Sequence, residues 1–148
     1  MTTMNHTLVA GTVAVMSENL SASDKIVVVT VLFLSHLALD MLPHKHFGNY
    51  RNIKGCFPQF LAEIVLGVVI LPLLIWQISS LNLAWLLVYV CAANLIDALL
   101  VIGWGPVVRV NDWTHKWEGQ ISLRRLRIFE FIQTFVVAGL FLTVLWLR

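Results

Sequence analysis

Long apolar stretches separated by short polar segments dominate the pattern of the chain. They cover residues 26–42, 57–78, 83–104 and 128–147, and a shorter one covers 7–16. Because a helix rises about 1.5 Å per residue, about 20 apolar residues cross the roughly 30 Å hydrocarbon core of a bilayer. The pattern predicts an all-α, polytopic membrane helix bundle with four long transmembrane helices and one short N-terminal membrane helix.

Small and turn-forming residues add detail to this bundle. Ala10, Gly11 and Ala14 give the short first helix a smooth side for close packing. Pro72 lies inside the third apolar stretch and is expected to kink it. The connection 79–82 is short and uncharged, so we expect the helices on either side of it to be antiparallel neighbours.

Composition supports the membrane assignment. Of the 148 residues, 59% are hydrophobic and 12% are charged, whereas a soluble domain has about 25% charged residues. Membrane lipids are therefore expected partners, and no nucleic-acid partner is expected. Cys56 and Cys91 are too few and too unlike in position for a disulfide framework or a thiolate metal site. Without an internal repeat or a long linker, residues 1–148 are expected to form a single integral membrane domain.

The charges of the loops predict an orientation. The loop after residue 43 contains Lys45, Arg51 and Lys54 and no acidic residue, and the segment after residue 104 is also basic. Because cytoplasmic loops are enriched in Lys and Arg, both loops are expected to be cytoplasmic, and five crossings place the N-terminus on that side too. The arginines near the start of the last helix favour anchoring at the interface, with phosphate binding as the alternative.

Histidine and carboxylate side chains occur within the apolar stretch 26–42. His36 and Asp40 are four residues apart and share one face of a helix, and His44 falls on nearly the same line one turn further. A lone histidine is often only a hydrogen-bonded packing residue, but two ionisable residues in a lipid-embedded helix indicate a functional site. Imidazole and carboxylate bind divalent metals, so we expect a metal ion, zinc or manganese, at this position.

The expected topology brings further polar residues to the same depth. Counted along their helices, His36, Glu63 and Asp97 each lie about 9 to 12 Å from the same membrane boundary. Nearer that boundary are His6, His44, His115 and Glu130. Polar residues that were each satisfied locally would be scattered through both leaflets, so the shared depth favours one pocket built from several helices.

Metal-assisted hydrolysis is the chemistry that such a pocket supports. A divalent ion held by His36, Asp40 and further ligands would activate a bound water and polarise a phosphoryl or carbonyl oxygen. Glu63 or Asp97 could accept the proton of that water as general base. The basic loops would attract an anionic or phosphorylated substrate. The mixed ligand set allows one ion or two.

Three features of the chain occur together: His6 within residues 5–11, the segment 35–44, and the later Asp97 followed by His115. In these features the chain resembles a family of small bacterial inner-membrane proteins, the membrane-bound metal-dependent hydrolases. The resemblance covers most of the chain in layout and is most specific over the ten residues around His36.

The resemblance implies a multi-helix protein of a bacterial-type inner (plasma) membrane with a metal site, and it implies no particular substrate. The metal ligands that it implies or allows are His6, His36, Asp40, His44 and His115. The chain departs from the family pattern after His44, where Lys45 stands in place of an acidic residue, and beside Asp97, which lacks the neighbouring proline.

Other functions would use the same residues. A small transporter or proton relay also places Asp, Glu and His inside the membrane, but it requires a polar path through the outer leaflet, which is nearly free of such residues. A non-catalytic module would use the metal only to hold helices together, or would bind a partner through its loops. Asp112, His115 and Glu118 fit a second ligand set and a charged interfacial loop equally well. The substrate, the oligomeric state and the roles of His46, Asp112, Glu118 and Glu130 stay open.

Overall fold

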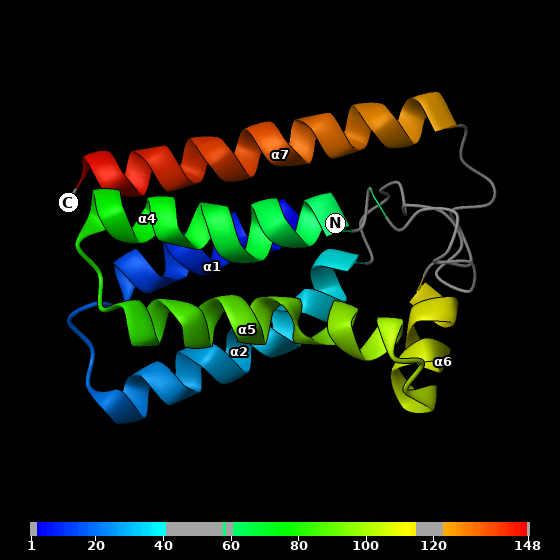
Figure 1. Cartoon of the computed structure of the whole chain (residues 1–148), viewed down its shortest axis with the longest axis horizontal. Coiled ribbons are helices and arrows are strands. Elements are labelled where there is room, and N and C mark those ends of the chain that lie inside the picture. Colours follow the sequence, from blue (N-terminus) through cyan, green and yellow to red (C-terminus); the bar gives the residue numbers. More distant parts are fainter. Residues whose placement is uncertain (1–2, 41–57, 59–60, 115–122, 148) are drawn as a thin grey trace.

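Helices joined by short connections make up the described part of the chain. The computed structural model describes residues 3–40, 58, 61–114 and 123–147. Its elements are α1 (Thr3–Met16), α2 (Ala22–Asp40), η2 (Val65–Ile70), α4 (Leu71–Ser79), α5 (Leu83–Val101), α6 (Gly105–Thr114) and α7 (Leu123–Trp146). These residues include no strand, and in this part of the chain the all-α prediction is confirmed. Successive long elements run in opposite directions along the bundle (Figure 1).

Three helices among the described residues are long and apolar enough to cross a membrane. They are Leu61–Ser79, Leu83–Leu100 and Ile128–Trp146, and they match the predicted stretches 57–78, 83–104 and 128–147. Many of their large apolar side chains are exposed, as expected of helices that face lipid. Length and composition therefore indicate a membrane protein.

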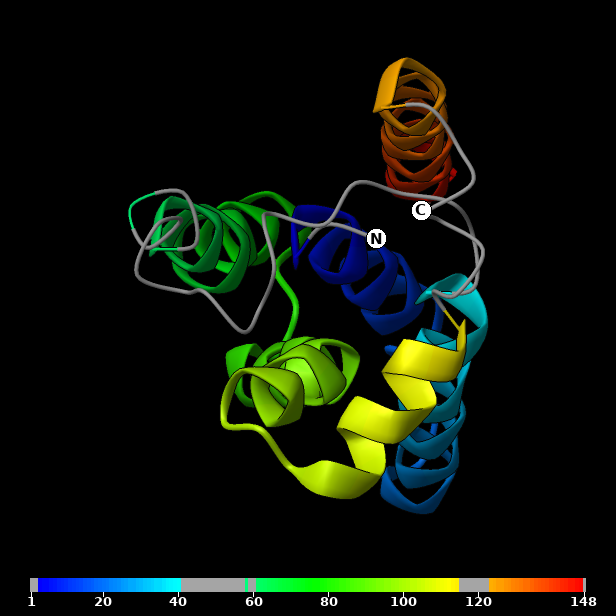
Figure 2. The same cartoon turned by 90° about the vertical axis from the view of Figure 1, so that its right-hand side faces the viewer.

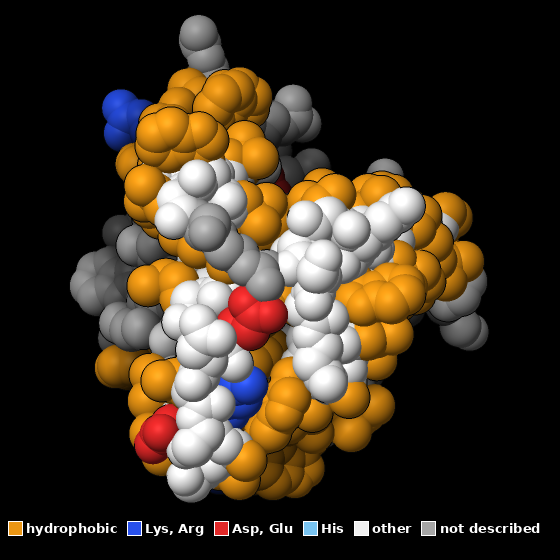
Figure 3. Space-filling view, turned by 90° about the vertical axis from the view of Figure 1, so that its left-hand side faces the viewer, with side chains coloured by type: hydrophobic (Ala, Val, Ile, Leu, Met, Phe, Trp, Pro, Cys, Tyr) orange, Lys and Arg blue, Asp and Glu red, His pale blue; other side chains and the backbone are white. Residues whose placement is uncertain are grey.

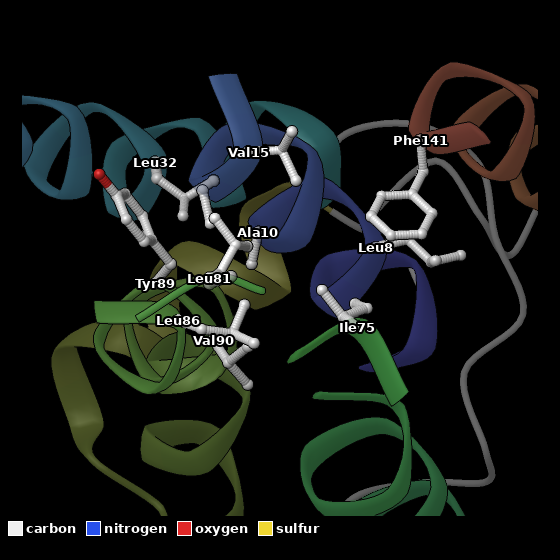
Figure 4. Close-up of a cluster of buried hydrophobic side chains, with 12 residues drawn as sticks. Leu8, Ala10, Val15, Leu32, Ile75, Leu81, Leu86, Tyr89, Val90 and Phe141 are labelled. Atoms are coloured by element: carbon white, nitrogen blue, oxygen red, sulfur yellow. The ribbon is translucent and has the colours of Figure 1, made fainter. Parts of the chain in front are cut away.

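The short helix α1 lies at the centre of the bundle (Figure 2). It packs against α5, α7, α4, η2 and α2. Figure 4 shows Leu8, Ala10 and Val15 of α1 among apolar side chains of the surrounding helices. Those neighbours include Leu32, Ile75, Leu86, Val90 and Phe141. Burial of apolar surface on several sides of α1 holds the other helices around it.

Small residues on α1 allow this close packing, as predicted. A Cβ atom at Gly11 would lie 2.8 Å from Cδ1 of Ile75 and 3.3 Å from Cε2 of Phe141. Ala10 and Ala14 are also buried in the core. Helix α1 is therefore shaped to be surrounded by other helices.

The expected disturbance near Pro72 takes the form of a π-helical turn. Residues of η2 continue directly into α4, and the N–H of Leu71 donates to the carbonyl of Leu66, five residues earlier. Proline has no N–H and crowds the preceding turn of an α-helix. Widening that turn to π geometry accommodates the ring without ending the helix.

A tight connection joins α4 to α5 and makes them antiparallel, as predicted. Ser80 adopts a left-handed conformation with φ of 53°, and its N–H donates to the carbonyl of Trp76. The side chain of Asn82 then caps α5 by accepting a hydrogen bond from the N–H of Trp85 at 3.2 Å.

The segment after α5 differs from the sequence prediction. We expected a helix to residue 104 followed by a loop, but α5 ends at Val101 and a second helix, α6, begins at Gly105. Gly103 has a φ of +75°, which turns the chain, and Pro106 fits the first turn of the new helix. Helix α6 lies across the end of the bundle (Figures 1 and 2).

Candidate metal centre

Three ionisable side chains from three helices meet near one end of the bundle. They are His6 of α1, His36 of α2 and Asp97 of α5, and one ligand atom from each lies within 4.8 Å of the others. Both imidazoles are buried, with 1% of each residue exposed, whereas the side chain of Asp97 is 33% exposed. We refer to these three residues as the His-His-Asp cluster.

The orientation of His36 is set by the backbone of α5. Its Nδ1 lies 2.5 Å from the carbonyl oxygen of Ala93. Because a carbonyl oxygen can only accept, Nδ1 must carry a proton and donate it. A neutral His36 then has its lone pair on Nε2, which lies 3.5 Å from Oδ1 of Asp97. Metal-binding histidines commonly have their second ring nitrogen held in this way.

It is unfavourable for the Nε2 lone pair to face a negatively charged carboxylate unless a positive charge lies between or beside the two groups. That charge can be a proton on the ring or a metal ion. The ring of His6 stacks on that of His36, with centroids 4.0 Å apart and planes 13° apart. Without a metal, a proton on Nε2 of His36 would supply the charge, and a neutral His6 would direct its own Nε2 proton toward Asp97, because protonation of both stacked rings would bring two buried positive charges together. A metal ion allows both imidazoles to stay neutral.

The distances in the His-His-Asp cluster fit ligands of one ion. Nε2 of His6 lies 3.9 Å from Oδ2 of Asp97, and Nε2 of His36 lies 3.5 Å from Oδ1. Zinc binds nitrogen and oxygen ligands at about 2.0–2.2 Å, so two ligands of a tetrahedral ion are roughly 3.3–3.6 Å apart. The distance from His36 to Asp97 already has this value, whereas the other ligand atoms, which lie up to 4.8 Å apart, must move closer to bind one ion. Three protein ligands with one position left open are typical of catalytic zinc sites.

A buried polar layer supports the cluster from α1 and α5. The amide nitrogen of Asn94 donates to the hydroxyl of Thr7 at 3.3 Å and to the carbonyl of Val90 at 2.8 Å. Asn5 and Thr7, on either side of His6, are fully buried. Sequence reasoning missed both residues, although three consecutive polar residues in a helix of small and apolar residues are the signal that could have found them.

Glu63 joins this end of the bundle from the third apolar segment. Its carboxylate is close enough to those of Asp97 and Glu130 to be repelled by their negative charges. It also accepts a hydrogen bond from the side chain of Thr3. The predicted convergence of His36, Glu63 and Asp97 therefore appears as one neighbourhood in the fold. Glu130, whose role the sequence left open, belongs to the same neighbourhood.

The geometry adds a candidate ligand role for Asp97 to the general-base role predicted from the sequence, which stays a prediction. We expected Asp97 to be a candidate general base and Asp40 to be the carboxylate partner of His36. In the structure each oxygen of Asp97 faces one histidine, which is the position of a ligand. Helix α2 reaches Asp40, but the side chain of Asp40 lies outside the described residues.

The other predicted site residues are not part of the cluster as described. His44, His46, His115 and Glu118 lie outside the described residues. Asp112 is on α6 and is exposed, so the proposed ligand set of Asp112, His115 and Glu118 stays a prediction.

A cavity of about 320 Å³ lies beside the cluster, between α5 and the segment 61–70. Its apolar lining comes from Ile64, Val68, Val90, Cys91, Leu95 and Ala98, and the polar residues Thr3 of α1, Asn94 and Asp97 also line it. Asp97 therefore belongs to both the cavity and the His-His-Asp cluster.

No family model, curated protein or solved structure matches the chain. The resemblance to membrane-bound metal-dependent hydrolases stays a prediction from the residues themselves.

Proposed function

We propose that the protein is a membrane-embedded hydrolase that uses one divalent metal ion, zinc or manganese, held by His6, His36 and Asp97. The observation that carries this proposal is the approach of one carboxylate to two stacked, buried imidazoles. The hydrogen bond from Nδ1 of His36 to the carbonyl of Ala93 directs the Nε2 lone pair toward that carboxylate. A positive ion makes this arrangement favourable.

The surrounding residues supply the remaining parts of a hydrolytic site. A bound ion would activate a water and polarise a phosphoryl or carbonyl oxygen of the substrate. Glu63, which interacts electrostatically with Asp97, takes the proton of that water as general base. Asp97 acts as a ligand in this proposal, and its exposed side admits the substrate.

The proposed setting is a bacterial-type inner membrane that the chain crosses five times. Helix α1 has 14 residues, about 21 Å at the rise of an α-helix, which is shorter than a bilayer core. Because α1 is surrounded by other helices, it does not have to match the lipid thickness. With the basic loops in the cytoplasm, the N-terminal ends of α1 and α7 lie at the cytoplasmic side, and an anionic or lipid-like substrate enters from that leaflet.

Metal analysis of the purified protein tests the ligand assignment. We expect about one zinc or manganese ion per chain in the wild type, and loss of that ion in Asp97→Ala and His36→Ala. Asp24→Ala removes an exposed carboxylate at the opposite end of α2 from His36 and should retain the ion. A wild type without stoichiometric metal, or an Asp97→Ala variant that keeps it, would contradict the proposal.

A turnover assay tests the catalytic part separately. Phosphoester and phospholipid substrates are incubated with the metal-loaded wild type and with Glu63→Gln. The variant should keep its metal and lose about 100- to 10,000-fold in rate, as expected for removal of a general base. A metal-loaded wild type that hydrolyses none of these substrates would support the non-catalytic reading, in which the ion only joins α1, α2 and α5.

A further inference from the structure

The cavity beside Asp97 has the properties of a hydrocarbon site. Ile64 and Val68 lie on one wall and Val90, Leu95 and Ala98 on the other. Both walls belong to candidate membrane spans. Water in a cavity needs several polar partners, and apart from Thr3, Asn94 and Asp97 the lining offers it none. The cavity is therefore suited to an apolar occupant.

Polar groups are concentrated where the cavity meets the cluster. Asn94 and Asp97 line the cavity from α5. Asp97 is the exposed member of the cluster, whereas both histidines are buried. A molecule in the cavity therefore reaches the cluster through Asp97. Its apolar part would lie along α5, and its polar part would lie at the proposed metal ion.

The fold explains why the cavity is open. Helices α4 and α5 pack together near their short connection, whereas η2 packs mainly on α1. A Cβ atom at Gly67 of η2 would be only 2.9 Å from Cγ2 of Thr3, which shows how closely these two elements approach. The segment 61–70 therefore follows α1 and moves away from α5 as it approaches the cluster. Cys91, Leu95 and Ala98 are exposed on that side of α5, so the cavity can be reached from the lipid-facing surface.

We propose that this cavity binds one acyl chain of a membrane phospholipid and presents its phosphate-bearing head group to the His-His-Asp cluster. This inference rests on the proposed function and specifies its substrate class. The positive charge of a bound ion complements the anionic head group, and the apolar lining complements the chain.

The size of the cavity also favours a single chain over a protein segment. From Val90 to Ala98, α5 rises about 12 Å, and the cavity along it has a volume of about 320 Å³. A helix from a second copy is about 10 Å across and would need roughly 900 Å³ over the same length.

Photo-crosslinking in vesicles tests the proposal. The probe is phosphatidylglycerol with a diazirine in one acyl chain, and the labelled positions are mapped by mass spectrometry. We expect label to be concentrated on residues 61–70 and 90–98, above the background on α7. Leu95→Trp should reduce the cavity label at least fivefold by filling the cavity. Leu87→Trp is the matched control, because Leu87 is on the same helix, is 42% exposed against 44% for Leu95, and does not line the cavity.

The metal content of each protein is measured in parallel. If Leu95→Trp loses the metal, Ala98→Leu is used to test whether filling the cavity reduces the label, because it fills the same cavity with less bulk. Even labelling of all lipid-facing helices, or full cavity label in a metal-loaded variant with the cavity filled, would overturn the proposal. Cavity label in a wild type that binds no metal would support the lipid site and remove the proposed hydrolase function.

Discussion

The two ends of the bundle bury polar side chains in different ways. At the end that holds the connections from α1 to α2 and from α4 to α5, the buried polar groups are hydroxyls. Ser17 donates to the carbonyl of Val13 at 2.7 Å and shares a hydrogen bond with the hydroxyl of Tyr89 at 2.7 Å. Ser79 donates to the carbonyl of Ile75. Figure 3 shows this end, where a few charged side chains lie among apolar ones.

At the other end two buried histidines from different helices face the partly exposed carboxylate of a third helix, beside the buried side chains of Asn5 and Thr7. His6, His36 and Asp97 belong to α1, α2 and α5. The hydrogen bond of His36 is to the backbone of a neighbouring helix, whereas Ser17 and Ser79 also bond to carbonyls three or four residues earlier in their own segments.

This difference separates polar groups that only stabilise the fold from polar groups that we propose to bind an ion. A hydroxyl that bonds to its own helix costs little to bury and requires no particular neighbour. Ionisable groups at membrane depth are expensive and are kept where they act on an ion, a proton or a substrate. The hydroxyl end therefore needs only correct packing, while the His-His-Asp end also needs the proposed ion.

Removal of one of the three proposed metal ligands should have the largest effect on zinc affinity. His6→Ala should lower zinc affinity by more than about 100-fold, because loss of even an outer hydrogen-bond partner of a ligand costs 10- to 100-fold. Ser17→Ala changes an equally buried side chain near the other end of α1 and should leave zinc affinity unchanged. A competition titration against a chelator measures both, and equal affinities would remove the distinction between the two ends.

Displacing the backbone of α1 near the cluster should have an intermediate effect on stability and on zinc affinity. In Gly67→Ala the new Cβ would lie 3.2 Å from the backbone nitrogen of Met4, so α1 must shift. Such overpacking typically costs about 1–3 kcal/mol, and zinc affinity should fall too because His6 is on the same stretch of α1. Gly139→Ala is the control, since a Cβ there meets nothing within 4 Å and alanine favours a helix by up to about 1 kcal/mol. Unfolding in detergent compares the two, and equal stabilities would show that η2 does not position α1.

Substitutions at the end that contains Ser17, Ser79 and Tyr89 should change stability and zinc affinity least. Tyr89→Phe removes one hydrogen bond but leaves Ser17 bonded to Val13, so we expect a loss of about 0.5–1.5 kcal/mol in the free energy of unfolding. Zinc affinity should not change. A drop in metal content in this variant would mean that the two ends are coupled through α1 and α5.

Much of the helical layout could be predicted from the sequence. Apolar stretches of sufficient length predicted the three candidate spans, because a bilayer core imposes that length on a helix whatever it packs against. The smooth face of Ala10, Gly11 and Ala14 and the antiparallel turn at 79–82 were also local properties. Helix α6 was missed, because it begins only after the chain turns at Gly103, and the kink expected at Pro72 takes the form of a π turn, which depends on a small departure from ordinary helix geometry.

The residues of the candidate site were only partly predictable. The sequence by itself determined the positions of His36, Glu63 and Asp97 along their apolar stretches, and so predicted a similar depth, since depth follows from counting along each helix. It pointed to Asp40 as the partner of His36, because spacing on one helix is the only geometry that a sequence contains. Only the tertiary structure decided that Asp97 faces both histidines and that the carbonyl of Ala93 orients His36. The rotation of each helix about its axis sets those contacts, and that rotation depends on how all the helices pack around α1.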